Sequence, residues 1–215
     1  MKPQIDAFVF DMDGTLLDTL PDLVDVTNAT MAHFGYPTHT QEEILAMVGN
    51  GLRSLITQAL PPNLDSAAVN ACIAYWKTLY DAQGDKKTRV YPGMIQTLDE
   101  LKARGKKLAV LSNKYDGGTK LMAQRYFSEQ MDFALGEGPV PRKPDPTGLL
   151  RVAQELDVPI QRVAFIGDSL TDIQTAQRAG AFAIAANWGY QPYEKLKAAK
   201  PDAIIDAPTD VLTFA

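Results

Sequence analysis

The chain has 215 residues, of which 46% are hydrophobic and 22% are charged. This is the composition of an ordinary globular protein with a packed core, so it excludes wholesale disorder. The formal net charge of −5 argues against general binding to nucleic acids or to anionic membranes. Cys72 is the only cysteine, so an intrachain disulfide is impossible and a cysteine-based zinc site is not expected.

The beginning of the sequence has no sign of a targeting segment. Its first apolar stretch, residues 7–10, is too short for the core of a signal peptide. No stretch approaches the roughly 20 apolar residues that a membrane-spanning helix needs. We therefore expect a cytoplasmic protein with neither a membrane nor a nucleic acid as partner.

The first predicted element is a buried strand over residues 5–10, which ends at Asp11. From about residue 20 to residue 80 the apolar spacing is helical only. Thr19 and Pro21 mark the start of the first helix in this segment, and Thr40 with Glu43 has the spacing of a capping box that opens the second. Two further apolar stripes, at 52–60 and 69–80, predict two more helices.

After residue 93 the pattern becomes an alternation of helices and strands. The predicted elements are a helix from about 94 to 104, a strand at 108–111, a helix at 118–126, a strand at 133–135, a helix at 147–156, a strand at 163–166, a helix ending at Gly180 and a strand at 182–186. Such alternation predicts an α/β fold with a Rossmann-like, doubly wound parallel sheet. Residues 1–16 and 89–215 form this predicted core, and residues 17–88 form an inserted helical cap domain.

Polar side chains follow three of the predicted core strands. Asp11 and Asp13 follow the first strand, Ser112 follows the strand at 108–111, and Asp168 follows the strand at 163–166. In open α/β sheets the carboxyl ends of the strands form the ligand-binding crevice. We therefore expect these side chains to converge, with Lys143 reaching the same edge from the loop at 140–146.

Four short motifs make the sequence resemble the haloacid dehalogenase-like hydrolase superfamily. They are Asp11-Met12-Asp13-Gly14-Thr15, Leu111-Ser112-Asn113, Lys143-Pro144-Asp145, and Gly167-Asp168-Ser169 with Asp172 four residues beyond Asp168. Each motif is weak alone, but the four in this order are specific and span the core. Within the superfamily the sequence looks like the phosphoglycolate phosphatase group, which has a helical cap between the first two motifs.

The resemblance implies roles for the residues at the strand ends. Asp11 is the expected nucleophile, which forms an aspartyl-phosphate, and Asp13 is the expected general acid and base. Ser112 and the backbone of Asn113 are expected to bind the phosphoryl oxygens, and Lys143 to supply positive charge in the transition state.

The clustered carboxylates imply a divalent cation, because they crowd negative charge around an anionic phosphate. A hard, oxygen-ligated ion such as Mg²⁺ meets this need. The resemblance implies the side chains of Asp11 and Asp168 and the backbone carbonyl of Asp13 as ligands. Asp172 is expected either as a further ligand or as a residue that supports one.

Three further residues are candidates for binding the substrate. Gly14 lets the backbone turn closely beneath the phosphate, and Thr15 beside it is expected at the same place. Arg53, in the predicted cap, follows a Gly-Asn-Gly segment, and its guanidinium suits a carboxylate or a phosphate. The alternative for this segment is a plain turn between two helices.

The leading hypothesis is a Mg²⁺-dependent phosphatase for a small phosphorylated metabolite, with 2-phosphoglycolate as the best guess. A sugar phosphomutase is the main alternative, although relatives of that type often carry Val where Thr15 stands. A phosphatase for nucleotides or pyrophosphate, and a phosphate-binding protein without catalysis, also stay open. Asp13 argues against a dehalogenase, which needs no acid for its leaving group. The expected assembly is a monomer or a homodimer.

Overall fold

The computed structural model describes residues 4–83 and 85–215. The chain divides into two compact units. One comprises Met1–Leu17 and Val90–Ala215, and the other is Asp18–Arg89. We call them the core unit and the helical unit.

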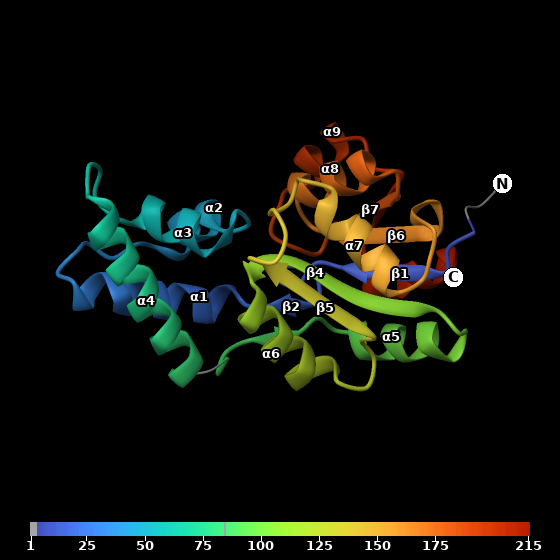
Figure 1. Ribbon diagram of the computed structural model, residues 1–215, viewed down its shortest axis with the longest axis horizontal. Helices are drawn as coiled ribbons and strands as arrows, with labels where there is room; N and C mark the ends of the chain where they lie inside the picture. Colours follow the sequence, from blue (N-terminus) through green and yellow to red (C-terminus); the bar gives the residue numbers. More distant parts are fainter. Residues whose placement is uncertain (1–3, 84) are drawn as a thin grey trace. The chain divides into compact units, whose positions relative to one another are not determined.

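The core unit is built on a parallel sheet (Figure 1). Within the described residues this sheet has six strands in the order β5-β4-β1-β6-β7-β8, and each neighbouring pair is parallel. In chain order the strands are β1 (Ala7–Phe10), β4 (Lys107–Tyr115), β5 (Phe133–Glu137), β6 (Val163–Gly167), β7 (Phe182–Ala186) and β8 (Ala203–Ile205). The predicted fold class, a doubly wound α/β sheet, is confirmed.

Helices cover both faces of the sheet, and its central strand β1 is therefore buried on both sides. Phe8 and Phe10 of β1 join one apolar cluster, and Ala7 and Val9 join another. Figure 1 shows α5 and α6 on one face and α7 and α8 on the other. The helical segments of the core unit are α5 (Met94–Ala103), α6 (Asp116–Phe127), α7 (Thr147–Glu155), α8 (Leu170–Ala179) and α9 (Tyr193–Ala198), with the 3₁₀ segments η1 (Ile160–Arg162) and η2 (Pro208–Phe214).

The register of the sheet aligns the end of β1 with positions in both neighbouring strands. Phe10, the last residue of β1, lies beside Val110 of β4 and Ile166 of β6. The residues that follow these positions therefore lie at one edge of the sheet, where ligands bind in folds of this kind.

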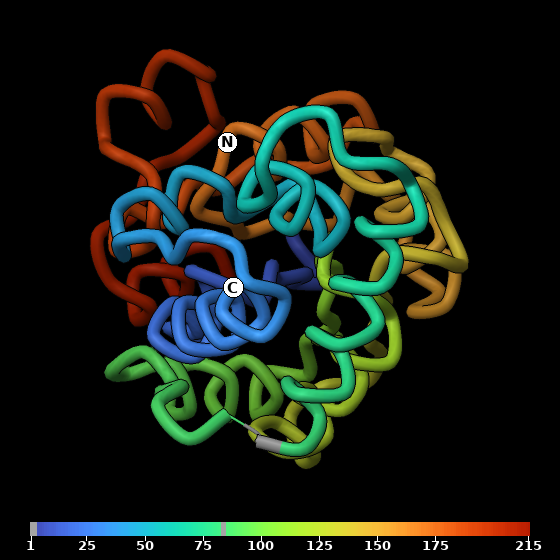
Figure 2. The backbone as a smooth tube through the Cα atoms, turned by 90° about the vertical axis from the view of Figure 1, so that its left-hand side faces the viewer, coloured from blue at the N-terminus to red at the C-terminus, as the bar shows by residue number. Residues whose placement is uncertain are grey.

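The helical unit packs around a buried tryptophan. Its helices are α1 (Leu20–His33), α2 (Gln41–Met47), α3 (Gly51–Ala59) and α4 (Ser66–Gln83), which Figure 2 traces from blue to turquoise. Trp76 of α4 donates its indole N–H to the Thr27 hydroxyl of α1 at 3.1 Å and stacks on Tyr80. The predicted capping box of Thr40 and Glu43 is confirmed at the start of α2.

A buried carboxylate joins the two ends of the helical unit. Asp22, in the first turn of α1, accepts hydrogen bonds from the backbone N–H of Thr88 at 2.6 Å and from its hydroxyl at 2.7 Å. The Lys87 N–H donates to the same carboxylate at 3.0 Å. Nearby, β2 (Leu17–Asp18) pairs with β3 (Arg89–Val90), where the chain passes between the two units.

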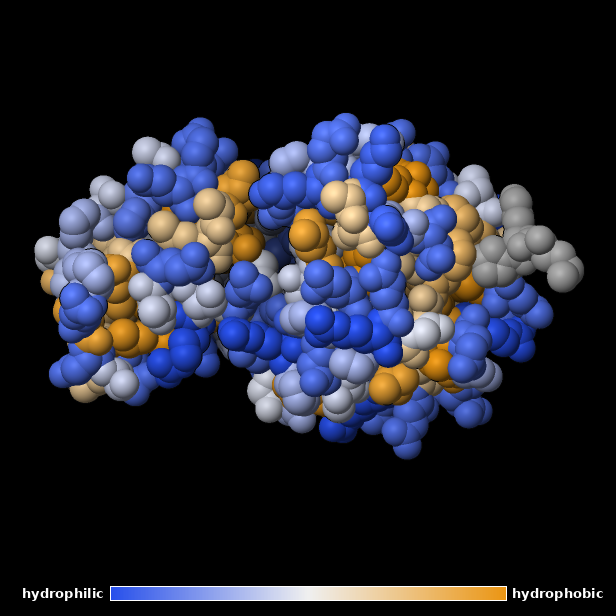
Figure 3. Space-filling view, turned by 90° about the horizontal axis from the view of Figure 1, so that it is seen from above, coloured by the Kyte–Doolittle hydropathy of each residue, from blue (hydrophilic) through white to orange (hydrophobic). Residues whose placement is uncertain are grey.

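The face of the protein seen in Figure 3 is largely polar. Hydrophilic residues cover most of the face in Figure 3, and hydrophobic residues stand between them in small groups. Isolated exposed hydrophobic residues are normal on protein surfaces. Within the described residues, no helix combines the length and the apolar character that crossing a bilayer requires.

Two differences from the predicted elements matter for the site. The strand predicted at 108–111 continues as β4 to Tyr115, so Ser112 lies within the strand rather than after it. The pairing of β4 with β5 shifts register between Leu111 and Tyr115. No predicted element corresponds to α9, β8 or η2, or to the shorter segments β2, β3 and η1, because short segments carry little periodicity.

Candidate active site

Asp11 and Asp13 lie in the turn that follows β1. The Asp11 N–H donates to the Ile166 carbonyl at 2.9 Å, which continues the pairing with β6 for one more residue. Asp11 is only 8% exposed, and its Oδ1 accepts the Met12 N–H at 2.7 Å. The chain then turns sharply at Gly14, whose φ is 86°. Because the chain turns back at Gly14, Asp11 and Asp13 both stay close to the end of β1.

Lys143 lies between two carboxylates. Its Nζ is 2.9 Å from Oδ1 of Asp11 and 2.6 Å from Oδ1 of Asp172. The ammonium group also lies over the Phe165 ring, 5.3 Å from the ring centroid. Lys143 is therefore a buried, fixed positive charge next to the predicted nucleophile.

The Asn113 side chain holds the backbone of Lys143 in place. Its Oδ1 accepts the Lys143 N–H at 2.7 Å, and its Nδ2 donates to the Lys143 carbonyl at 3.1 Å. The sequence analysis assigned Asn113 a backbone contact with the phosphoryl group. The structure adds a structural role for its side chain, which ties the 140–146 loop to β4.

Asp168 lies after β6 and is 2% exposed. Its carboxylate accepts the Thr15 hydroxyl at 3.0 Å and the Tyr190 N–H at 2.7 Å. The Trp188 indole donates to the Thr15 carbonyl at 3.0 Å, so the 188–190 segment fixes this corner of the site. Thr15, predicted at the phosphate, has its hydroxyl directed to Asp168 instead.

Asp172 lies in the first turn of α8, the helix that follows Asp168. With Ser169 it forms a capping box at the start of α8, in which the Ser169 hydroxyl is 2.5 Å from Asp172 Oδ2. Its other oxygen contacts Lys143. Asp172 therefore contacts and positions Lys143, and whether it is also a cation ligand stays a prediction.

β4 supplies Ser112 and a residue that the sequence analysis missed. Ser112 is 4% exposed, and its Oγ accepts the Lys114 N–H at 3.2 Å. The Lys114 ammonium group lies 3.3 Å from Oδ1 of Asp13, and the two side chains are 4% and 16% exposed. The available signal was a lysine directly after Ser112 and Asn113, in a stretch already expected at the sheet edge.

Burial dominates the electrostatics of the carboxylates. It raises the pKa of Asp11 to about 7, against the opposing effect of Lys143. Burial, together with the charges of Asp172 and Asp11, raises the pKa of Asp168 to about 8. Burial alone would lower the pKa of Lys143, but the neighbouring Asp11 and Asp172 outweigh it and raise that pKa above its ordinary value. Lys143 therefore stays protonated at neutral pH.

The donor set fits a hard divalent cation. Asp11, Asp168 and Asp172 each place a carboxylate oxygen within 4.8 Å of the others. Burial raises the pKa of Asp11 and Asp168, and a cation beside them would favour their charged forms. Mg²⁺ prefers oxygen ligands of this type.

Arg53 belongs to the helical unit. It lies on α3, where its guanidinium donates to the Asn70 side chain of α4 at 2.5 Å. The structure thus gives Arg53 a partner within its own unit, and its contact with a substrate stays a prediction.

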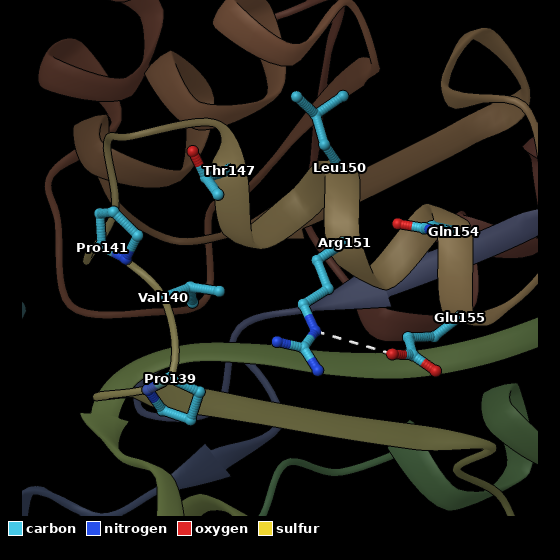
Figure 4. Close-up of a pocket in the computed structure, with 8 residues that line it drawn as sticks. All are labelled: Pro139, Val140, Pro141, Thr147, Leu150, Arg151, Gln154 and Glu155. Atoms are coloured by element: carbon cyan, nitrogen blue, oxygen red, sulfur yellow. Dashed lines mark ion pairs between the residues drawn. The ribbon is translucent and has the colours of Figure 1, made fainter.

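A surface groove of about 790 Å³ lies beside α7 in the core unit (Figure 4). Figure 4 shows Pro139, Val140 and Pro141 along one side and residues of α7 along the other. An Arg151–Glu155 ion pair of 3.6 Å lies at its edge. The eight residues that line the groove include none of the aspartates of the candidate active site, so the groove is separate from it.

Comparison with known proteins agrees with this geometry. The family model described as haloacid dehalogenase-like hydrolase matches residues 8–186. The phosphoglycolate phosphatase of Pseudomonas syringae pv. tomato is 33% identical over 205 residues, which cover 92% of this chain and 75% of that protein. The phosphoglycolate phosphatase of Aliivibrio fischeri is 30% identical, over 96% of this chain and 94% of that protein.

Solved structures give the same result. The crystal structure of a predicted phosphoglycolate phosphatase from Haemophilus somnus superposes with a TM-score of 0.91 and 26% identity, covering 98% of this chain and 97% of that one. The family match spans most of the core unit and the whole helical unit. The chain therefore belongs to the haloacid dehalogenase-like hydrolases and is similar, within them, to the phosphoglycolate phosphatase group.

Proposed function

We propose that this hydrolase is a Mg²⁺-dependent phosphatase that acts on a small phosphomonoester through an aspartyl-phosphate, with 2-phosphoglycolate as its best candidate substrate. The observation that carries the proposal is the convergence of Asp11, Asp13 and Lys143 at the sheet edge that also holds Asp168. The names of the relatives support the choice of substrate.

In the first step, a carboxylate oxygen of Asp11 attacks phosphorus while the bond from phosphorus to the ester oxygen breaks. Lys143 and the Met12 N–H both contact Oδ1, so we assign Oδ2 as the attacking oxygen. Asp13, as the carboxylic acid, gives its proton to the departing ester oxygen, which leaves as an alcohol. The products of this step are the aspartyl-phosphate and the free alcohol.

In the second step, Asp13 is a carboxylate and takes a proton from water as the water oxygen attacks phosphorus. The bond from phosphorus to Asp11 breaks, which regenerates the Asp11 carboxylate and releases inorganic phosphate. Lys143 stabilises the negative charge near Asp11 in both steps, because it is buried and fixed by Asn113 and Asp172.

A bound Mg²⁺ would supply charge neutralisation that lets the phosphate dianion approach the carboxylates. The side chains of Asp11 and Asp168 and the backbone carbonyl of Asp13 are the proposed ligands. Asp172 is proposed to position Lys143, as its 2.6 Å contact supports. Thr15 and the Tyr190 N–H would orient Asp168.

The helical unit is proposed as the cap of the enzyme, with Arg53 as a candidate contact for the part of the substrate that does not react. A cytoplasmic location and a monomer or homodimer stay predictions from the sequence. Arg53→Ala should raise KM for 2-phosphoglycolate more than for an alkyl phosphate that lacks a carboxylate, if Arg53 binds the carboxylate of the substrate.

The proposal is tested with purified protein, 2-phosphoglycolate and a panel of other phosphomonoesters, with Mg²⁺ or with EDTA. We expect phosphate release that requires Mg²⁺ and that Asp11→Asn abolishes. Asp65→Asn is a matched control, because Asp65 only caps a helix through its contact with the Ala68 N–H and asparagine caps equally well. Turnover that persists in Asp11→Asn, or in full chelation, would disprove the mechanism.

Two further measurements separate this mechanism from its alternatives. Acid quenching during turnover, followed by peptide mass spectrometry, should find the mass of one phosphoryl group on the peptide that contains Asp11. NMR of reactions with glucose 1-phosphate should show inorganic phosphate if the ester is hydrolysed at all. Formation of glucose 6-phosphate would instead indicate a phosphomutase.

A further inference from the structure

We propose that Lys114 is a positioning residue for the reaction, which holds the Asp13 carboxylate on the β4 side of the site for proton transfer to and from the substrate oxygen. This inference rests on the proposed phosphatase function. It assigns a role to a lysine that the family motifs quoted above do not include.

The buried ammonium group of Lys114 lies beside Asp13, the predicted general acid. Lys114 Nζ lies 3.3 Å from Asp13 Oδ1, and the lysine side chain is only 4% exposed. A long, charged side chain is rarely buried so completely unless it is paired. A surface ion pair would contribute little, but a pair with this degree of burial is costly to break, because it leaves an uncompensated charge.

The backbone of Lys114 is anchored on both sides. Its N–H donates to the Ser112 hydroxyl at 3.2 Å, and its carbonyl accepts the Thr119 hydroxyl at 3.1 Å. Gly136 of β5 packs against the same carbonyl so closely that a Cβ there would collide with it. The backbone of Lys114 is therefore held in place, as is required of a residue that positions another side chain.

The two buried lysines of the site have different partners. Lys143 contacts Asp11 and Asp172, whereas Lys114 contacts Asp13. Lys143 and any bound cation lie beside Asp11, so we infer that Lys114 attracts the Asp13 carboxylate away from those charges. A carboxylate drawn to those charges would be misplaced for proton transfer, and misplacement by about 1 Å can cost roughly 100-fold in rate.

This role predicts a defect that depends on the leaving group. An alkoxide such as that of glycolate is a poor leaving group and needs the proton of Asp13, whereas 2,4-dinitrophenolate leaves without one. Loss of Lys114 should therefore slow phosphoryl transfer from 2-phosphoglycolate but not from 2,4-dinitrophenyl phosphate. A residue that only binds the phosphoryl group, or only supports the fold, would affect both substrates alike.

The experiment compares Lys114→Met with wild type in rapid-mixing measurements at saturating Mg²⁺. We expect the single-turnover rate with 2-phosphoglycolate to fall about 100-fold. The burst of 2,4-dinitrophenolate, which reports transfer to Asp11 before water attacks, should keep its wild-type rate. Lys114→Arg keeps the charge and should recover part of the loss. Lys120→Met removes a lysine that is 56% exposed and should behave as wild type.

Asp13→Asn supplies the second test. If Lys114 acts through Asp13, then adding Lys114→Met to Asp13→Asn should cause little further loss. Equal defects with both substrates, or defects that multiply in the double variant, would overturn the proposal. If Lys114→Met does not fold, Lys114→Gln carries the same comparison, because it keeps a hydrogen-bond donor. Absence of turnover by the wild type would instead refute the proposed function, so the two failures are distinguishable.

Discussion

The hydrogen bond from Thr15 to Asp168 should set the affinity of the site for Mg²⁺. Thr15→Val removes the hydroxyl and keeps the size and β-branched shape of the side chain. Both residues are buried, with exposed fractions of 0% and 2%, so water cannot easily replace the lost donor. The hydroxyl contacts the carboxylate at 3.0 Å and favours its charged form, which is the form that binds a cation.

The size of the effect follows from the partners of Asp168. A hydrogen bond to a charged group contributes about 1.5–3 kcal/mol, and 1.4 kcal/mol corresponds to about tenfold in affinity. The Tyr190 N–H still donates to Asp168 at 2.7 Å in the variant. We therefore expect Thr15→Val to weaken Mg²⁺ binding about tenfold, at the low end of the 10- to 100-fold that outer-shell partners of metal ligands typically contribute.

Isothermal titration of Mg²⁺ into the protein at neutral pH measures this change directly. Thr15→Ser, which keeps the hydroxyl, is the matched control and should retain most of the affinity. At saturating Mg²⁺ the KM for 2-phosphoglycolate should be close to that of wild type. Wild-type Mg²⁺ affinity in Thr15→Val, or an equal loss in Thr15→Ser, would refute this account. A change confined to KM would favour the original assignment of Thr15 to the substrate.

Three further predictions concern the turn, the helical unit and pH. Gly14→Ala should weaken Mg²⁺ binding in the same titration, because Gly14 has a φ of 86° and a Cβ there would collide with the Asp168 carboxylate. Asp22→Ala should destabilise the helical unit by about 3 kcal/mol, because the buried N–H and hydroxyl of Thr88 lose their hydrogen-bond acceptor. Amide hydrogen exchange should become faster in α1–α4 but not in the strands of the core unit. In EDTA, the free energy of unfolding should fall as pH rises from about 4 to about 8. The fold raises the pKa of Asp11 to about 7 and that of Asp168 to about 8 from 3.8, so the folded state keeps protons that the unfolded state releases. Urea titrations at several pH values measure how the free energy of unfolding changes with pH, and saturating Mg²⁺ should make this change smaller. A free energy of unfolding that instead rises from about pH 4 to about pH 8 would contradict the raised pKa values.

The sequence by itself determined the fold class, and it predicted residues that the structure brings to one edge of the sheet. The doubly buried strand before Asp11 and the later alternation of strands and helices are local patterns, so they are readable without coordinates. The four motifs predicted that Asp11, Ser112 and Asp168 lie at one sheet edge, because they follow apolar runs that were predicted as parallel strands. The contact of Lys143 with Asp11 agrees with its predicted reach to the same edge.

Only the tertiary structure decided which of these groups contact one another. Thr15 is predicted for the substrate but donates to Asp168, a residue 153 positions away in the chain. Lys114 lies next to a motif, yet its pairing with Asp13 depends on how β4 continues past Leu111, where its register with β5 shifts. Hydrogen bonds and ion pairs are short-range and directional, so they depend on the packed positions of side chains, whereas strand and helix periodicity depends on neighbours along the chain.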